Sequence, residues 1–382
     1  MSKVEELLET YNPNGVEFDE IGKNVQSLPK EILKNEFVQQ QGQYPVINSG
    51  RDIQGYYSRY NNDGDVFTVA SRGESAGFIQ YSATPFWAGG LCYPYRTKDN
   101  NKVSTKFLYY YLKKTEKSIM TNMVLRGGIP AINKSDFEKY KIPLPHIKVQ
   151  EEIVKILDSF TNLIDALNEE LSLRQKQLEY YREKLLTFDD DVEKFIVTEV
   201  AQLKSGLTYK PSDVSDKGIL VLRSSNIKNG FLSYDDNVFV KESTKISDRS
   251  IVRCNDILIC VRNGSKKLVG KCAMIDKNAD GMAFGAFMSV LRAKDINPKY
   301  LFYVWSSQII QDKIKGDDAA PINQITSKDF NRLLIPVPKE QIQQSIVEKL
   351  DAFESLISSL KEEIALRQKQ YEYYREKLLT FD

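Results

Sequence analysis

The chain has 382 residues, which is enough for two or three domains that each bury a core of their own. Its 53 basic and 52 acidic residues nearly cancel, so no overall field draws it to a polyanion, although local basic patches remain possible. No apolar run is long enough to cross a membrane and the first residues lack an apolar leader, so we expect a cytoplasmic protein without a membrane partner.

The cysteine and histidine content argues against several kinds of enzyme. Cys92, Cys254, Cys260 and Cys272 form no Cys-x-x-Cys pair, which favours free buried thiols over disulfides or zinc ligands. The single histidine, His146, lies between a proline and a helical pattern, where a surface residue at a helix start is the simplest interpretation. We also find no phosphate-binding glycine motif and no adenine methyltransferase motif. The sequence therefore predicts a binding protein without a catalytic residue, metal or cofactor of its own.

In chain order, two globular regions alternate with two long helical patterns. Residues 1–145 and 191–338 are rich in glycine, tyrosine and short β-branched runs, which is typical of mixed strand and helix. Residues 146–190 and 339–382 contain no glycine or proline and carry apolar residues at alternating steps of three and four. This pattern predicts one helix in each segment, about 60 Å long for forty residues.

A small domain cannot bury the apolar stripe of so long a helix, so we expect the two helices to pack on each other. Antiparallel packing suits a chain that crosses a whole globular region between them. The predicted fold class is α+β, with two pseudo-repeated globular α/β domains separated by two long helices that form an antiparallel coiled coil.

The chain is an internal repeat with a spacing of 193 residues. The sequence LRQKQLEYYREKLLTFD at 173–189 returns at 366–382 with one change, Leu178 to Tyr371. Packing of the stripe does not require identical solvent-facing residues, whereas docking of two copies of one partner does. Recent duplication or recombination is the alternative explanation. The basic residues of this predicted partner-binding face are Arg174, Lys176, Arg182, Arg367, Lys369 and Arg375.

Two divergent globular regions separated by near-identical long helices resemble the specificity (S) subunit of type I restriction-modification systems. The match is carried by Ile142–Pro145 and its copy Ile335–Pro338, each leading into a long helix, by the Leu-Asp-x-Phe segments and helical tails, and by the run Asp-Ile-Leu-Ile at 256–259. The resemblance covers essentially the whole chain.

The resemblance implies a subunit in which each globular region is a target recognition domain for one half of a split double-stranded DNA sequence. The helices would set the gap between the half-sites and dock two methyltransferase (M) subunits. Restriction translocase (R) subunits would join the assembled core. S-adenosylmethionine, ATP and Mg would then belong to these partners.

Candidate DNA contacts are polar and basic residues beside glycine or serine at strand ends, because Arg and Lys read guanine and Asn reads adenine. The first domain offers Arg51, Tyr57, Ser71, Arg72 and Arg126. The second domain offers Arg223, Ser225, Asn226, Arg262, Asn263, Lys266 and Lys267, of which the two lysines suit phosphate. A surface or intramolecular role is the alternative for each of these residues.

Two other functions fit the same pattern, namely a standalone two-domain DNA-binding regulator and a coiled-coil adaptor whose domains bind proteins. A nuclease fits least, given one histidine and no acidic metal motif. The residues before Val16 are unassigned, and we expect them to pack near the far end of the second helix.

Overall fold

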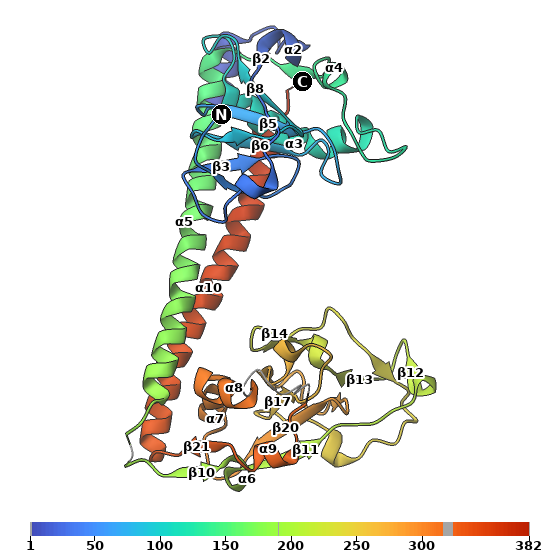
Figure 1. Ribbon diagram of the computed structural model, residues 1–382, viewed down its shortest axis with the longest axis vertical. Coiled ribbons are helices and arrows are strands. Elements are labelled where there is room, and N and C mark those ends of the chain that lie inside the picture. The colour runs from blue at the N-terminus through green and yellow to red at the C-terminus, as the bar shows by residue number, and fades with distance from the viewer. Residues whose placement is uncertain (1, 190, 316–323, 382) are drawn as a thin grey trace. The chain divides into compact units, whose positions relative to one another are not determined.

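The computed structural model describes residues 2–189, 191–315 and 324–381 (Figure 1). They form two compact units, Met1–Asn168 with Glu362–Asp382 and Glu169–Lys361. Each unit contains one globular domain together with part of both long helices. The helical patterns at 146–190 and 339–382 are observed as α5, Ile147–Leu186, and α10, Glu340–Leu378.

The long helices pair through their apolar stripes. In the first unit, Phe160 of α5 stacks on Tyr374 of α10 with the ring centroids 5.3 Å apart. In the second unit, Tyr181 of α5 stacks on Phe353 of α10 at the same 5.3 Å. The two contacts join the same pair of repeat positions, and the α10 partner moves back along the chain as the α5 residue moves forward. The helices are therefore antiparallel, and the predicted fold class is confirmed.

The first globular domain is built around a four-stranded antiparallel sheet in the order β2-β8-β5-β6. Its central strand β5 is buried along its whole length and packs against α3. A smaller sheet, β4-β3-β7, contains a parallel β3–β7 pair. The elements are β2 (Val25–Ser27), β3 (Tyr44–Ile47), β4 (Gly55–Tyr57), β5 (Val66–Ala70), β6 (Ile79–Ser82), β7 (Trp87–Ala88), β8 (Cys92–Thr97), α3 (Thr105–Asn122) and α4 (Lys134–Phe137).

The second globular domain repeats this plan with different lengths. Its main sheet has the order β11-β20-β17-β18, its central strand β17 is fully buried, and a parallel β13–β19 pair lies in the smaller sheet β12-β16-β13-β19. The elements are α6 (Val197–Val200), β11 (Ala201–Ser205), β12 (Val214–Ser215), β13 (Ile219–Leu222), β14 (Ile227–Lys228), β15 (Phe231–Leu232), β16 (Phe239–Val240), β17 (Ile257–Cys260), β18 (Cys272–Met274), β19 (Ala283–Phe284), β20 (Met288–Ala293), α7 (Pro298–Ser306), α8 (Gln308–Lys315) and α9 (Ser327–Phe330).

A two-stranded ladder closes each domain at the start of its long helix. In the first unit β1 (Phe18–Glu20), followed by α2 (Ile21–Asn24), pairs with β9 (Lys141–Pro143). In the second unit β10 (Lys194–Ile196) pairs with β21 (Leu334–Pro336). The second strand of each ladder carries the Ile-Pro repeat, so the repeated motif delivers the chain into the helix.

One aspartate on each long helix holds a domain helix in place. Asp158 of α5 accepts a 2.6 Å hydrogen bond from the Tyr110 hydroxyl and pairs with Lys106 at 2.8 Å, both from α3. In the second unit Asp351 of α10 binds the equivalent residues of α7, the Tyr303 hydroxyl at 2.6 Å and Lys299 at 2.7 Å. We call these two clusters the aspartate junctions.

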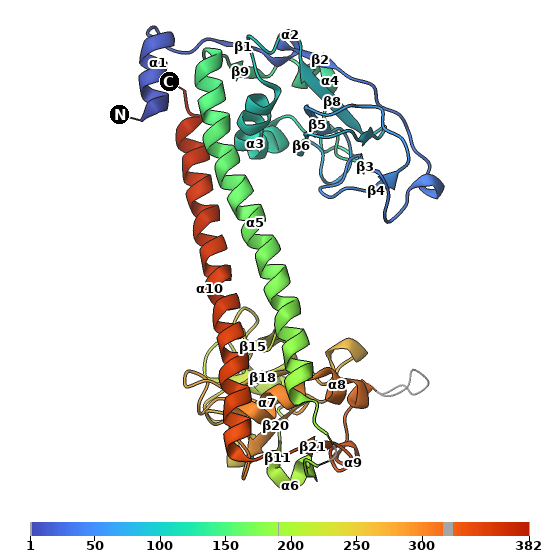
Figure 2. The ribbon, with the colours of Figure 1, turned by 90° about the vertical axis from the view of Figure 1, so that its left-hand side faces the viewer.

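The first residues of the chain form α1, Lys3–Tyr11, which packs beside the end of α10 (Figure 2). Val4 is buried in the same core as Leu378 and Leu379, and Glu5 pairs with Lys377 at 3.6 Å. This is the place expected for them, near the far end of the second long helix.

His146 is exposed immediately before α5, and its ring stacks on Tyr11 with centroids 4.4 Å apart. A surface position at a helix start was the simplest interpretation of this histidine, and the structure agrees with it. Among the described residues, no helix combines the length and apolarity that a bilayer crossing needs.

Replacing Asp158 with alanine should destabilise the first unit by about 1–3 kcal/mol, because a buried tyrosine hydroxyl loses its acceptor and a lysine its counterion. Differential scanning calorimetry should show a lower transition temperature for one part of the chain. The matched control is Asp165→Ala, which removes an exposed aspartate from the same helix and should leave the transition unchanged. Equal effects of the two substitutions would contradict a structural role for the junction.

Candidate nucleic-acid interface

In the first domain, predicted DNA contacts gather where strand β5 ends. Ser71 and Arg72 open the turn Ser71–Phe78, which we call the β5–β6 turn, and Arg72 is bridged to Ala131. Arg126 lies in the segment Leu125–Ala131, which we call the α3–α4 loop. Arg72 and Arg126 are exposed, whereas Ser71 is only 7% exposed. Two guanidinium groups are therefore available at this edge, and Ser71 has little surface to offer.

Of the other two predicted contacts of this domain, one lies at the β5–β6 turn and the other does not. Arg51 places its guanidinium 5.4 Å from the centre of the Phe78 ring, and its carbonyl accepts a hydrogen bond from Gln80, so it joins the β5–β6 turn. Tyr57 lies on β4 in the smaller sheet and packs edge-on against Trp87 at 5.0 Å. The structure brings Arg51, Arg72 and Arg126 to one turn and loop pair, and it does not place Tyr57 with them.

In the second domain the ends of β13 and β17 come together. The Asn263 amide donates to the Ser224 hydroxyl at 3.1 Å, which ties the loop after β17 to the loop after β13. Arg262 is exposed and lies over the Phe287 ring, 5.2 Å from its centre. Arg223 pairs with Asp236 at 3.2 Å. An arginine held by a carboxylate in this way is oriented in advance for a planar acceptor such as a guanine edge.

The loop after β13 and the segment between β19 and β20 border a cavity of about 460 Å³, which is lined by Arg223, Ser225, Gly285 and Phe287 among others. The Arg223 Nε and Ser225 Oγ atoms are buried and have no hydrogen-bond partner within the described part of the chain. Buried polar atoms without partners are rare and favour a site that a polar ligand group completes. Phe287 is 58% exposed beside them.

Asn226 is fully buried, and its side chain is engaged within its own loop. Its amide oxygen accepts from the Arg223 N–H at 2.9 Å, and its amide nitrogen donates to the Ser233 carbonyl at 3.0 Å. This geometry supports the intramolecular alternative for Asn226, which shapes the loop that presents Arg223. Lys266 and Lys267 lie in a short 3-10 turn, Lys266–Leu268, in which Lys267 is exposed.

Some residues of this second site were not anticipated from the sequence. Phe287 lies far along the chain from Arg223, and neither it nor Asp236 belongs to a local motif. Ser224 could have been found, because it adjoins two predicted residues and resembles them chemically. An ion-pair partner and an exposed aromatic ring are identified only by the tertiary contacts.

The four cysteines are free, and Cys92, Cys260 and Cys272 are buried. Burial raises the pKa of the Cys92 and Cys272 thiols to about 12, so both stay protonated and unreactive at neutral pH. Within residues 2–189, 191–315 and 324–381, no group of His, Cys, Asp and Glu side chains is arranged to hold a metal ion.

The predicted partner-binding face starts alike in both copies. Arg174 pairs with Glu170 at 3.2 Å and donates to Gln177 at 3.0 Å. The repeat-equivalent Arg367 pairs with Glu363 at 3.3 Å and donates to Gln370 at 3.2 Å. Lys176 and Lys369 are both exposed. Identical local geometry at this end of the face is what two copies of one partner would need.

About two turns further along, the two faces differ. Arg182 contacts Glu183 at 3.4 Å, whereas Arg375 lies over the Tyr371 ring, 5.3 Å from its centre. Tyr371 is the single changed residue of the tail, and its counterpart is Leu178. The shorter side chain lacks a ring for the arginine, so the same arginine takes a different partner in each unit.

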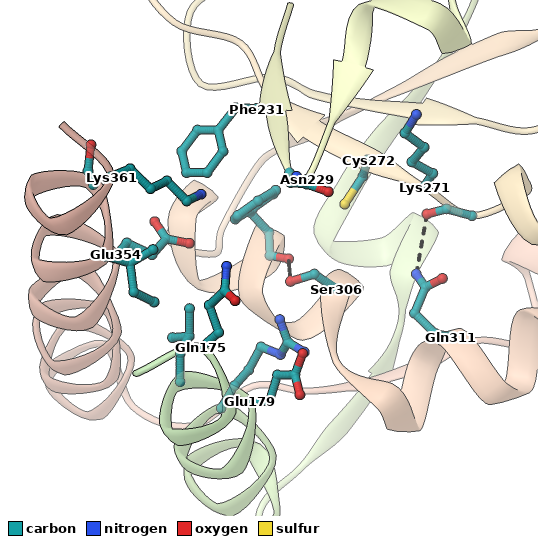
Figure 3. A pocket seen from close by; sticks show the side chains of 17 residues that line it. Gln175, Glu179, Asn229, Phe231, Lys271, Cys272, Ser306, Gln311, Glu354 and Lys361 are labelled. Atoms are coloured by element: carbon teal, nitrogen blue, oxygen red, sulfur yellow. Dashed lines mark hydrogen bonds between the residues drawn. The ribbon is translucent and has the colours of Figure 1, made fainter. Parts of the chain in front are cut away.

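Leu178 lines a groove of about 800 Å³ in the second unit (Figure 3). Glu354 and Lys361 of α10 form one wall, Gln175 of α5 another, and Phe231 the rim. Burial raises the pKa of the Glu354 carboxyl. In the first unit the position of Leu178 is taken by Tyr371, which packs against the core.

Tyr371→Leu should therefore lower the stability of the first unit by about 1–2 kcal/mol, through lost ring packing and a lost cation–π contact with Arg375. The reciprocal change, Leu178→Tyr, should cost much less because the groove has room for the larger ring. Calorimetry of both variants measures the difference. If Leu178→Tyr is the more damaging of the two, this account of the groove is wrong.

Two pseudo-repeated α/β domains joined by an antiparallel helix pair define a class of two-module scaffold proteins, and solved structures share this fold. The S subunit of a type I restriction-modification system from M. genitalium superposes with a TM-score of 0.64, covering 96% of each chain at 18% identity. A chain from a study of type I R-M complex assembly gives a TM-score of 0.56 at 16% identity.

The sequence profile of the Type I restriction modification DNA specificity domain matches residues 16–174 and 189–366, so the chain belongs to this family. The type I restriction enzyme EcoR124I/EcoR124II specificity subunit of Escherichia coli is 28% identical over 410 residues, covering 100% of this chain and 97% of that protein. The putative specificity subunit S.HindORF215P of Haemophilus influenzae is 29% identical over 417 residues, covering 99% and 98%.

Proposed function

We propose that this chain is the sequence-specific DNA-recognition subunit of a type I restriction-modification complex, in which each globular domain reads one half of a bipartite target. The observation that carries the proposal is that an exposed arginine lies at the equivalent strand end of each domain, Arg72 after β5 and Arg262 after β17. The scaffold around these clusters repeats, while the residues displayed on it differ. Two different half-sites are the expected consequence.

The long helices act as spacer and docking surface. Recognition modules that face the same side of a duplex must lie about one helical turn apart, near 34 Å or a multiple of it. Two continuous helices without glycine or proline can hold such a separation. The duplicated polar face then binds two M subunits, one for each copy, and R subunits join the assembled core.

The chain itself contributes no catalysis in this proposal. Adenine methylation with S-adenosylmethionine belongs to M, and ATP- and Mg-dependent translocation and cleavage belong to R. The single histidine is a surface residue at a helix start, where its ring stacks on Tyr11. We expect the complex to act in the cytoplasm.

A selection from a random-sequence duplex pool tests the proposal against its rivals. With M present, the chain should enrich a split motif with two unlike halves. Equal enrichment without M would instead favour a standalone regulator. An absence of enrichment under every condition would favour a protein-binding adaptor and would refute DNA recognition.

Arg72→Ala and Arg262→Ala should each relax the target at a position in only one half-site. The expected loss of discrimination is about 1–3 kcal/mol per base contact, roughly ten- to a hundredfold. Repeating the selection with each variant measures it. Lys267→Ala is the control, because loss of a phosphate contact should weaken binding without changing the motif. Changes in both half-sites from one substitution would contradict independent reading.

Removing the charges of the polar face should weaken assembly with M, and sedimentation velocity of S with M measures this. Substituting one copy should leave one M bound, and substituting both copies should leave none. Unchanged assembly of the double set would show that the identical surface reflects duplication alone. The two sets to be changed to alanine are Arg174, Lys176 and Arg182, and Arg367, Lys369 and Arg375.

A further inference from the structure

The α3–α4 loop of the first unit exposes two large aliphatic side chains. Ile129 is 70% exposed and Leu125 is 59% exposed. Exposed apolar side chains that gather on one part of a surface are candidates for a contact with a partner. The contact cannot be with the rest of the described unit, because both side chains face solvent there.

The loop that carries these side chains is held firmly. The backbones of Leu125 and Ala131 exchange both hydrogen bonds of an antiparallel pair, at 2.8 and 3.1 Å. Gly73 of the β5–β6 turn donates to the Pro130 carbonyl at 2.8 Å. Because Ile129 precedes a proline, its backbone is also restricted to extended conformations. The backbone that carries the exposed isoleucine is thus preorganised, and it loses little conformational entropy on binding.

The charge around the loop is mainly positive. Arg126 lies within it, Arg72 is bridged to its far end, and Arg51 lies over the neighbouring turn. Glu74 is the acidic residue of the β5–β6 turn. Aliphatic side chains flanked by several arginines suit a polyanion with an apolar interior, which is the chemistry of a DNA duplex.

The backbone of the loop tip is open to close approach. A side-chain carbon added at Gly127 or Gly128 would meet no atom within 4 Å. A phosphate-sugar strand can therefore come against this backbone without a steric barrier from the domain. These two glycines separate Arg126 from Ile129, so a charged and an aliphatic residue flank a segment that has no side chains.

We propose that Ile129 is a wedge that enters the minor groove and inserts between two base pairs of the half-site read by the first domain. Leu125 lies against the groove wall and Arg126 along the groove or its phosphates. Aliphatic side chains inserted from the minor groove unstack a base step and kink the duplex. The inference rests on the proposed function and adds a mechanism to it, namely that one base step of the target is selected by how easily it opens.

The test uses the full chain assembled with M on the duplex found by selection, with 2-aminopurine placed at each position of the first half-site in turn. Fluorescence should rise at one step, because unstacking relieves quenching. Ile129→Ala should abolish the rise while binding persists through the phosphate contacts, and Ile129→Leu should keep it. Ile32→Ala is the matched control, since it removes the same atoms from an isoleucine that is 82% exposed in the same unit.

Each other outcome overturns the inference in a recognisable way. If the native complex binds but shows no rise at any step, or if Ile129→Ala shows the native rise, there is no wedge and the proposed function still stands. If Ile129→Ala instead prevents assembly with M in the absence of DNA, the loop is a protein contact. If no variant binds any duplex, the proposed function fails and the wedge fails with it.

Discussion

The aspartate junctions are the constraint on which the rest of the structure depends. Asp158 and Asp351 each accept a hydrogen bond of 2.6 Å from a tyrosine hydroxyl and pair with a lysine, and they join a domain helix to a long helix in each unit. Burial raises the pKa of the Tyr110 and Tyr303 hydroxyls, so both remain protonated donors at any physiological pH. A spacer helix can define a distance between two recognition sites only if each domain is fixed to it, and the junctions do this.

The internal repeat distinguishes the residues that maintain the scaffold, which recur in both units, from the loops proposed to recognise DNA, which differ. The junction residues, the stacked Phe160–Tyr374 and Phe353–Tyr181 contacts and the Ile-Pro strands recur at the same spacing in both units. The loops after the central strands have diverged in length and content. Arginines remain at these strand ends and are bridged to equivalent positions, Arg72 to Ala131 and Arg262 to Gln324, while Arg262 also lies over the Phe287 ring. Constancy of the scaffold with variation at its tips is the arrangement expected of a protein that changes its target without changing its partners.

Periodicity and repetition predicted the fold because both are properties of sequence alone. The helix bounds 146–190 and 339–382 differ from Ile147–Leu186 and Glu340–Leu378 by a few residues at the ends. The pairing of the helices followed from the length of the apolar stripe, and its antiparallel sense followed from the globular region that the chain crosses between them. The exposed positions of Arg72 and Arg262 at strand ends were also expected, because each follows a β-branched run and lies within two residues of a glycine.

Whether an individual loop side chain is exposed or hydrogen-bonded within the protein could not be predicted from periodicity or repetition. Asn226 is of a residue type that reads adenine, yet it is buried and hydrogen-bonded within its own loop. The groove beside Leu178 combines segments that are distant in the chain, and neither the Arg223–Asp236 ion pair nor the exposure of Ile129 has a local sequence signature. Local sequence defines what a side chain can donate or accept, and tertiary packing decides whether it is free to do so.

The central claim is that two separately fixed domains each read one half-site, at a gap set by the helices. It is tested most directly by a chain in which residues 1–145 are replaced by a second copy of 191–338, assembled with M and used in the same selection. The selected motif should be an inverted repeat of the second half-site with the native gap, because the helices are antiparallel and unchanged. An unchanged asymmetric motif, or a symmetric motif with a different gap, would contradict it.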